Sequence, residues 1–173
     1  PPRSTLFPYT TLFRSVKMEQ EKIIIRKATK KDINIIYEMI NGLAAYEKRP
    51  NDMTGSIEML KYWLFEKKLA TAVIAKNNDG KPIGYAIYYP VFASFSAHAN
   101  AHLEDLFIKS EYRGRGYGKE FFLKLSKMIL NDGYSKLEWS CLDWNLSSIE
   151  FYKKIGSKEE TGRVYFEYKL NND

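Results

Sequence analysis

The sequence is poor in the residues that form disulfide bonds and bind metals. Among 173 residues it has one cysteine, Cys141, and two histidines, His98 and His102. A single cysteine excludes an internal disulfide bond and fits a reducing compartment. No spacing of these residues is typical of a zinc site. Because Cys141 stands in an alternating apolar stretch, we expect it to be buried and inert.

Long apolar runs are also missing from the sequence. A transmembrane helix needs about 20 consecutive, predominantly apolar residues, and no run in the chain approaches this length. We therefore expect a soluble, metal-free, cytoplasmic protein.

The first fifteen residues, PPRSTLFPYTTLFRS, have neither helical nor strand periodicity. They resemble the translation of a widely used short-read sequencing adapter, so we interpret residues 1–15 as a library artefact. A secretory signal peptide needs a continuous apolar stretch and a small-residue cleavage site, and this segment has neither. We expect the natural chain to begin at Met18, which leaves residues 18–170 as a single domain.

The basic character of the chain depends largely on this first segment. Without Arg3, Arg14 and Lys17 the formal net charge falls from +6 to +3. The remaining basic residues, such as Lys67 and Lys68, are spread among acidic ones, which is typical of a solvated surface and not of a nucleic-acid-binding patch. We therefore expect no nucleic-acid partner.

The apolar pattern predicts a mixed α/β fold. Thr29 and Asp32 have the spacing of a capping box that opens a helix, and Asn77 to Gly80 form a hairpin turn between two strands. Asn145 is expected to cap a short helix that stops at Gly156. The predicted order is β-α-α-β-β-β-α-β-α-β, with strands at 23–26, 71–76, 82–91, 102–109, 136–142 and 163–170 and a second helix at 56–66.

Strand 102–109 contains adjacent acidic residues. A period of two places one set of side chains on one face of the sheet and the alternate set on the other. The first set is His102, Glu104, Leu106 and Ile108, and the second is Leu103, Asp105 and Phe107. Glu104 and Asp105 are therefore expected to point in opposite directions.

The segment RGRGYG, residues 113–118, joins this strand to an amphipathic helix. Its three glycines allow a ligand to approach the backbone, and the unpaired N–H groups and dipole of the following helix suit a pyrophosphate. A tight turn or an RG-type nucleic-acid segment are the alternatives. A Rossmann site fits less well, because the long βαβ unit and its acidic residue are missing. The strand–loop–helix context favours phosphate binding.

Several blocks of the sequence resemble the GNAT superfamily. Its signature Arg/Gln-x-x-Gly-x-Gly/Ala is matched by Arg113, Gly116 and Gly118. The resemblance is more specifically to the diamine (spermidine/spermine) and thialysine N-acetyltransferases. It is carried by LAAYEK at 43–48, GYAIYY at 84–89, LEDLFI at 103–108, EYRGRGYG at 111–118, and LDWN with FYK between 142 and 153.

This resemblance implies a twisted mixed sheet flanked by helices, and acetyl transfer from acetyl-CoA to an amine in a ternary complex. It implies a homodimer, and CoA bound between two splayed parallel strands, 102–109 and 136–142. Cys141 is then not a nucleophile. By position, the implied CoA contacts are Leu106, Phe107, Ile108, Arg113, Gly114, Arg115, Gly116, Tyr117, Gly118, Lys119, Asn145, Tyr152 and Lys154.

Acetylation requires an amine with a free lone pair. An alkylammonium group with a pKa near 10.4 loses its proton at pH 7 at a cost of about 4.6 kcal/mol. Glu104 is the candidate base, directly or through a water; the alternative is that Glu104 only binds the cation and solvent takes the proton. Tyr152 matches the general acid of the family and would protonate the departing thiolate; the alternative is a core aromatic residue.

Substrate choice is expected to depend on acidic and aromatic residues that accept ammonium groups. The candidates are Glu47, Glu104, Asp105 and Trp144. Each also has a simpler explanation as a solvated charge, a backbone cap or a packing residue. The loop 93–100 departs from the family pattern, so another amine, such as an aminoglycoside, an amino acid or a protein N-terminus, stays open. A CoA-binding domain without turnover is a further alternative.

Overall fold

The computed structural model describes residues 23–170, so the expectations about residues 1–15 and Met18 lie outside the described part of the chain. Its centre is a five-stranded sheet in which the strands lie in chain order. The first four strands are antiparallel to their neighbours, and the fifth is parallel to the fourth. The predicted mixed sheet is therefore confirmed. The strands are β1 (Ile23–Lys27), β2 (Thr71–Asn77), β3 (Pro82–Ala93), β4 (His98–Ile108) and β5 (Leu137–Glu138).

The helices follow the predicted apolar periodicity closely. They are α1 (Ile33–Tyr46), α2 (Ile57–Lys61), α3 (Tyr117–Asn131) and α4 (Leu146–Lys154), and a π-helical turn, Tyr62–Glu66, extends α2. The capping box precedes α1, because the Thr29 N–H donates to the Asp32 carboxylate at 2.7 Å. Arg26 pairs with the same carboxylate at 2.7 Å and holds the pKa of Asp32 well below its usual range.

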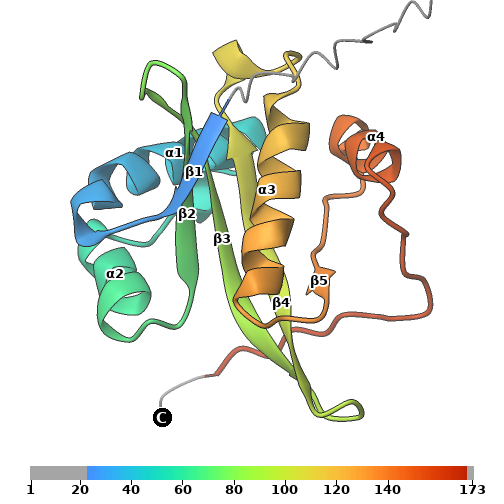
Figure 1. Cartoon of the computed structure of the whole chain (residues 1–173). Helices are drawn as coiled ribbons and strands as arrows, with labels where there is room; N and C mark the ends of the chain where they lie inside the picture. The colour runs from blue at the N-terminus through green and yellow to red at the C-terminus, as the bar shows by residue number, and fades with distance from the viewer. Residues whose placement is uncertain (1–22, 171–173) are drawn as a thin grey trace, which may run out of the picture.

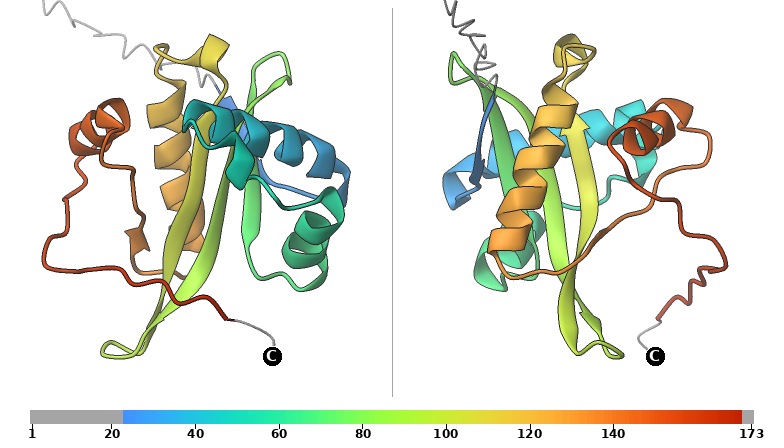
Figure 2. Two further views of the ribbon diagram at one scale, coloured as in Figure 1. Left: turned by 180° about the vertical axis from the view of Figure 1, so that it is seen from behind. Right: turned by 45° about the vertical axis from the view of Figure 1, so that its right-hand side comes forward.

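The helices cover the two faces of the sheet unequally. Figures 1 and 2 show α1 and α2 on one face and α3 on the other, with α4 set apart beyond β5. The α3 face is a continuous apolar core that includes Tyr88, Leu103, Phe121 and Leu125. The α1 face has its own core around Ile36, Tyr85 and Phe107. Functional side chains can therefore lie at the end of the α1 face that these helices leave exposed.

A β-bulge at Glu104 changes the predicted alternation of β4. Ile87 of β3 pairs with Asp105, but the next residue, Tyr88, pairs with Leu103, so Glu104 is the extra residue. Leu103 belongs to the core on the α3 face, whereas Asp105 accepts a hydrogen bond from Tyr85 on the α1 face. The predictions that Leu103 and Asp105 share a face and that Glu104 and Asp105 point in opposite directions are both wrong, because the bulge shifts the alternation by one residue and turns Glu104 toward His102 on the α1 face.

The β3–β4 hairpin is longer than predicted. Residues 93–100 were expected to form a loop, but β3 continues to Ala93 and β4 begins at His98. Near its base, Gly84 lies against the carbonyl oxygen of Phe107. A Cβ atom there would displace the β4 backbone, so glycine is required at this position for the two strands to pair.

The C-terminal part of the chain differs most from the prediction. The strand expected at 136–142 is confirmed only at Leu137–Glu138. The closing strand expected at 163–170 is wrong: the segment has no regular structure, and Val164, Phe166 and Leu170 are between 80 and 91% exposed. Its apolar residues alternate as they do in a strand. Among residues 23–170, however, no strand lies beside this segment to form backbone hydrogen bonds with it.

Candidate active site

The strands β4 and β5 separate immediately after they meet. Their pairing is limited to Ala101 with Leu137 and His102 with Glu138. In the part of the chain that the structure describes, residues 104–108 of β4 therefore have no strand on the β5 side. The predicted parallel pairing is confirmed at these two positions, but residues 139–142 form no strand. The backbone of the predicted CoA-binding residues Leu106, Phe107 and Ile108 lies along this edge.

The glycine loop, residues 113–118, connects this edge to α3. Gly114 and Gly116 have φ values of 73° and 85°, a left-handed backbone conformation that glycine adopts at the lowest cost. Gly116 is the N-cap of α3, so Tyr117, Gly118 and Lys119 form the first turn, where N–H groups lack intrahelical partners. The loop therefore has the backbone geometry of a phosphate site.

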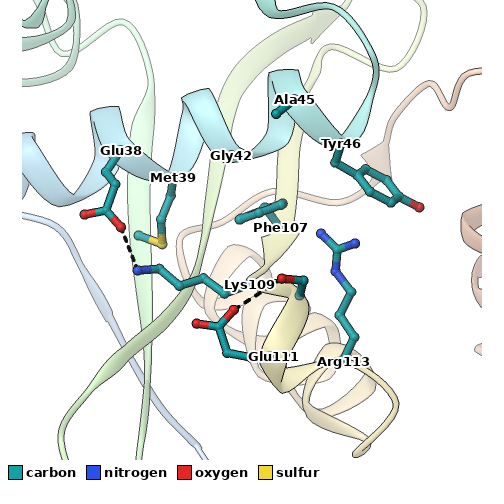
Figure 3. Close-up of a pocket in the computed structure, with 10 residues that line it drawn as sticks. Glu38, Met39, Gly42, Ala45, Tyr46, Phe107, Lys109, Glu111 and Arg113 are labelled. Atoms are coloured by element: carbon teal, nitrogen blue, oxygen red, sulfur yellow. Dashed lines mark hydrogen bonds and ion pairs between the residues drawn. The ribbon is translucent and has the colours of Figure 1, made fainter.

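Arg113 places its side chain on the α1 side of the loop. Its Nε donates to the carbonyl oxygen of Ile108 at 2.8 Å, and its guanidinium lies 4.2 Å from the ring centre of Tyr46 and 5.2 Å from that of Phe107. Figure 3 shows these groups together with Lys109, which pairs with Glu38 at 2.9 Å. The side chain of Arg113 therefore ties the end of β4 to α1, and the Arg113 backbone N–H donates to the carbonyl oxygen of Ser110 at 3.1 Å.

Tyr46 also joins α1 to α4. Its hydroxyl donates to Asn145 Oδ1 at 3.1 Å, and the same oxygen accepts from the Ser148 N–H at 3.3 Å. Asn145 is only 6% exposed and caps α4 as predicted. The prediction did not assign a role to Tyr46; its place in LAAYEK, beside Glu47, was the available signal.

Tyr152 projects from α4 into a cluster of aromatic rings. Its ring centre lies 5.0 Å from that of Trp139 and 6.4 Å from that of Phe122. Burial raises the pKa of the hydroxyl, and the nearby Cys141 and Glu47 raise it further. Tyr152 therefore keeps its proton at neutral pH and lies close to the end of α1.

Two carboxyl groups and a tyrosine meet on the α1 face. The Tyr85 hydroxyl donates to Asp105 Oδ2 at 3.1 Å, and Tyr85 is fully buried. Burial raises the pKa of Asp105 to about 6, with further increases from Glu104 and Glu47. Burial also raises the pKa of Glu47. Asp105 and Glu47 line one side of a cavity of about 190 Å³.

The sequence that forms this site matches the model of a known protein family. The acetyltransferase (GNAT) family model matches residues 36–156. The chain belongs to the GNAT family. The predicted resemblance is thereby confirmed, and this GNAT protein is an N-acetyltransferase whose co-substrate is acetyl-CoA.

The relatives include enzymes that act on small amines. This GNAT acetyltransferase is 32% identical over 147 residues to the thialysine N-epsilon-acetyltransferase of Sus scrofa, which covers 80% of this chain and 86% of the relative. It is 32% identical over 95 residues to the L-ornithine N5-acetyltransferase of Arabidopsis thaliana, which covers 55% of this chain and 40% of that one. These relatives support an amine acceptor.

Solved structures confirm the fold. An aminoglycoside acetyltransferase from an uncultured soil metagenomic sample aligns with a TM-score of 0.72 at 18% identity, covering 86% of this chain and 97% of that one. An integron cassette protein of V. cholerae aligns with a TM-score of 0.70 at 22% identity, covering 87% and 94%. At these identities the alignment supports the fold and not the substrate.

The remaining predicted site residues of the acetyltransferase differ in their distance from this centre. Glu104 is 57% exposed and lies 4.0 Å from His102. The Trp144 ring holds the Lys48 ammonium at 5.3 Å, so a cation of the protein itself occupies its face. Lys154 is exposed and lies 3.7 Å from Glu150. Of these three residues, Glu104 lies close enough to Asp105 to raise the pKa of that carboxyl, whereas the contacts of Trp144 and Lys154 are with Lys48 and Glu150.

Neither the apolar length that a membrane span requires nor the grouping of side chains that a metal site requires is present among residues 23–170. No helix in this range is long and apolar enough to cross a bilayer. The same residues include no group of three or more histidine, cysteine, aspartate or glutamate side chains placed to hold a metal ion. Burial raises the pKa of the Cys141 thiol, which makes it a weaker nucleophile at neutral pH.

Proposed function

We propose that this GNAT acetyltransferase acetylates a primary amine of a small, multiply cationic molecule, a diamine, polyamine or thialysine-like amino acid. The observation that carries the proposal is the carboxylate cluster of Glu47, Glu104 and Asp105 beside the unpaired edge of β4. Partly buried carboxylates that repel one another gain most from a cation placed between them. An alkylammonium group supplies that charge.

The residues along the unpaired edge fit acetyl-CoA. The backbone of Leu106, Phe107 and Ile108 would hold the pantetheine arm, and the glycine loop with Lys119 would hold the pyrophosphate. Asn145 and Lys154 would make the remaining contacts near the thiol end and along the arm. Acetyl-CoA supplies the electrophilic carbonyl, and the protein supplies positioning and proton transfer.

Glu104 would take the proton of the attacking ammonium group, directly or through a water. Its side chain is solvent-accessible, so no large desolvation cost opposes its charged form. Removal of the proton frees the lone pair, which attacks the carbonyl in one ternary complex. A positioned base contributes about 10²–10⁴-fold to such a step.

Tyr152 would donate the proton that the departing thiolate needs. Its raised pKa keeps the hydroxyl protonated, and the ring packing against Trp139 fixes its direction. The nearby thiol of Cys141 is not used as a nucleophile in this scheme. A buried tyrosine with a fixed hydroxyl is suited to this single proton transfer.

The size of the cavity near Asp105 favours a linear amine. A volume of about 190 Å³ is small in comparison with ordinary ligand pockets of about 300–1,000 Å³. This volume suits an aminoalkyl chain better than the ring system of an aminoglycoside. The names of two relatives support the same class of substrate, because thialysine and ornithine each have a second amino group.

The test is release of free CoA thiol from acetyl-CoA by purified enzyme. The panel is thialysine, lysine, ornithine, spermidine, putrescine and an aminoglycoside, each against a blank without amine. We expect turnover with the linear amines. Turnover with the aminoglycoside alone would reject the substrate class, and acetyl-CoA binding without turnover on any amine would support a non-catalytic domain.

We also propose a cytoplasmic homodimer in which residues 18–170 act as one catalytic domain. The exposed apolar side chains of residues 163–170 support self-association, because contiguous exposed apolar surface is typical of interfaces. Light scattering after size exclusion measures the mass directly. A monomer at assay concentration would reject the dimer, and loss of activity on deletion of residues 1–15 would reject the domain boundary.

A further inference from the structure

Three strands align ionisable side chains in a row at the point where β4 and β5 separate. His102 of β4 pairs with Tyr89 of β3 on one side and with Glu138 of β5 on the other. The rings of Tyr89 and His102 stack with centres 5.0 Å apart and an interplanar angle of 30°. The stacking holds the imidazole in one orientation, beside Glu138 of the neighbouring strand β5.

This row lies on the same face as the carboxylate cluster. The neighbours Ala101, Leu103 and Leu137 pack into the core on the α3 face. Alternation along the strands therefore places His102 and Glu138 on the opposite face. The bulge brings Glu104 to the end of the row, with its Oε2 atom 4.0 Å from His102 Nε2.

The acetylation scheme does not specify which group takes the proton from Glu104 after the amine has reacted. A carboxylate beside a substrate cation is a weak base, because the cation stabilises its charged form. Each turnover also requires Glu104 to lose the proton that it has taken. An imidazole takes up and releases a proton near neutral pH, which is the property that this step needs.

We propose that His102 receives the amine proton from Glu104 and passes it to solvent, so that it acts as a proton relay and positioning residue for the base. The inference rests on the proposed function. The ammonium N–H bond breaks and its proton moves to the Glu104 carboxylate. The amine lone pair then forms the new C–N bond as the C–S bond of acetyl-CoA breaks; the thiolate takes the Tyr152 proton, and the second proton of the acetylated nitrogen returns through solvent to Tyr152. The first proton then moves from Glu104 to His102 Nε2, and from the imidazolium to water.

The distances and charges around His102 suit this transfer. A separation of 4.0 Å is closed by one bridging water or by a rotation of the exposed Glu104 side chain. His102 is 22% exposed, which gives the imidazole a route to solvent. The charged groups around it are Glu104, Glu138 and Lys136, and Lys136 itself pairs with Glu138 and with Glu160 at 3.3 Å each. Tyr89 remains protonated, since burial and Glu104 raise its pKa.

The test compares the pH dependence of kcat in wild type, His102→Gln and His98→Gln, with the best amine of the panel. Glutamine preserves hydrogen bonding but cannot carry the proton. We expect His102→Gln to lower kcat at least about tenfold near pH 7. The kcat of this variant should return toward the wild-type value as the pH approaches the amine pKa of about 10. His98 is the other histidine of the chain and is exposed on the same strand, so His98→Gln should match wild type.

Two further variants separate relay from packing. Free imidazole should partly restore kcat in His102→Ala but not in Glu104→Gln. The double variant Glu104→Gln with His102→Gln should be no slower than Glu104→Gln alone, because both residues serve one transfer. A kcat loss that is equal at every pH and insensitive to imidazole would overturn the relay and assign His102 a packing role. A wild-type enzyme silent on every amine would instead reject the proposed function.

Discussion

The two halves of β4 have different surroundings, and the bulge at Glu104 divides them. From His98 to Leu103 the strand pairs with β3 throughout and meets β5 at Ala101 and His102. From 105 to 108 it pairs with β3 alone, and Glu104 is the unpaired residue of the bulge. The first half has its hydrogen-bonding groups shared among strands of the sheet, whereas the second retains a row of backbone groups for a ligand. In the proposed scheme, a single strand therefore supplies both stability and the edge that binds the co-substrate.

The largest effect should come from the residue at the division itself. Glu104→Gln removes the proposed base, so kcat should fall about 10²–10⁴-fold at neutral pH, and the rate profile should shift toward higher pH. Circular dichroism should show unchanged folding, because the side chain is exposed. An unshifted profile with a raised KM for the amine would assign Glu104 to cation binding alone.

A variant of the paired half should affect stability and spare the chemistry. Leu103→Ala removes a side chain that is 2% exposed, so the free energy of unfolding should decrease by about 2–5 kcal/mol. Denaturant titration gives that value. At a temperature where the variant is fully folded, kcat per molecule should equal that of wild type; a tenfold loss of kcat there would contradict the division of β4.

Tyr152→Phe tests the proposed contribution of α4 to the same reaction. It deletes one hydroxyl and keeps the ring that packs on Trp139, so kcat should fall about 10–100-fold with little change in folding. Isothermal titration should show acetyl-CoA affinity within about twofold of wild type. Unchanged turnover would remove Tyr152 as the acid, and greatly weakened binding would make it a CoA contact.

The smallest effect is a change in KM with pH through Asp105. Its pKa is raised to about 6, so the carboxyl is neutral below that pH and charged above it. The KM for a dicationic amine should therefore rise severalfold as the pH falls from about 7 to about 5, while Asp105→Asn should show a high KM throughout. A KM in the variant that still follows pH would place the titrating group elsewhere.

The raised pKa of Asp105 affects stability in the direction opposite to amine binding. As the pH rises, the charged carboxyl binds the amine more tightly but makes the folded state less stable. A carboxyl that ionises near 3.8 when unfolded and near 6 when folded favours the folded state below about pH 4 and loses that contribution as the pH rises through about 6. Asp105→Asn should therefore melt at a higher temperature than wild type at pH 7. A lower melting temperature would show that the charged Asp105 is held by more than its bond from Tyr85.

Local sequence signals predicted the elements whose form depends on neighbouring residues. The hairpin turn at Asn77 to Gly80, the capping box at Thr29 and the Asn145 cap all follow from side-chain and backbone contacts within a few positions. The left-handed glycines at 114 and 116 belong to the same class. The conformation of the glycine loop and the helix after it were therefore predictable.

Contacts between distant segments were not predictable from the same signals. The bulge at Glu104 depends on the register between β3 and β4, which alternation along one strand does not specify. The stacking of Arg113 on Tyr46 and the bond from Tyr85 to Asp105 join residues 67 and 20 positions apart. The segment 163–170 has a strand pattern without a strand partner, so its conformation depends on surroundings that the pattern does not contain.

The most direct test of the division of β4 is residue-resolved amide exchange with and without acetyl-CoA. The account predicts slower exchange at residues 104–108 and in the glycine loop, 113–118, when acetyl-CoA is added, with little change from 98 to 103. Equal protection along both halves of β4, or protection confined to other segments, would contradict the assignment of this edge to the co-substrate.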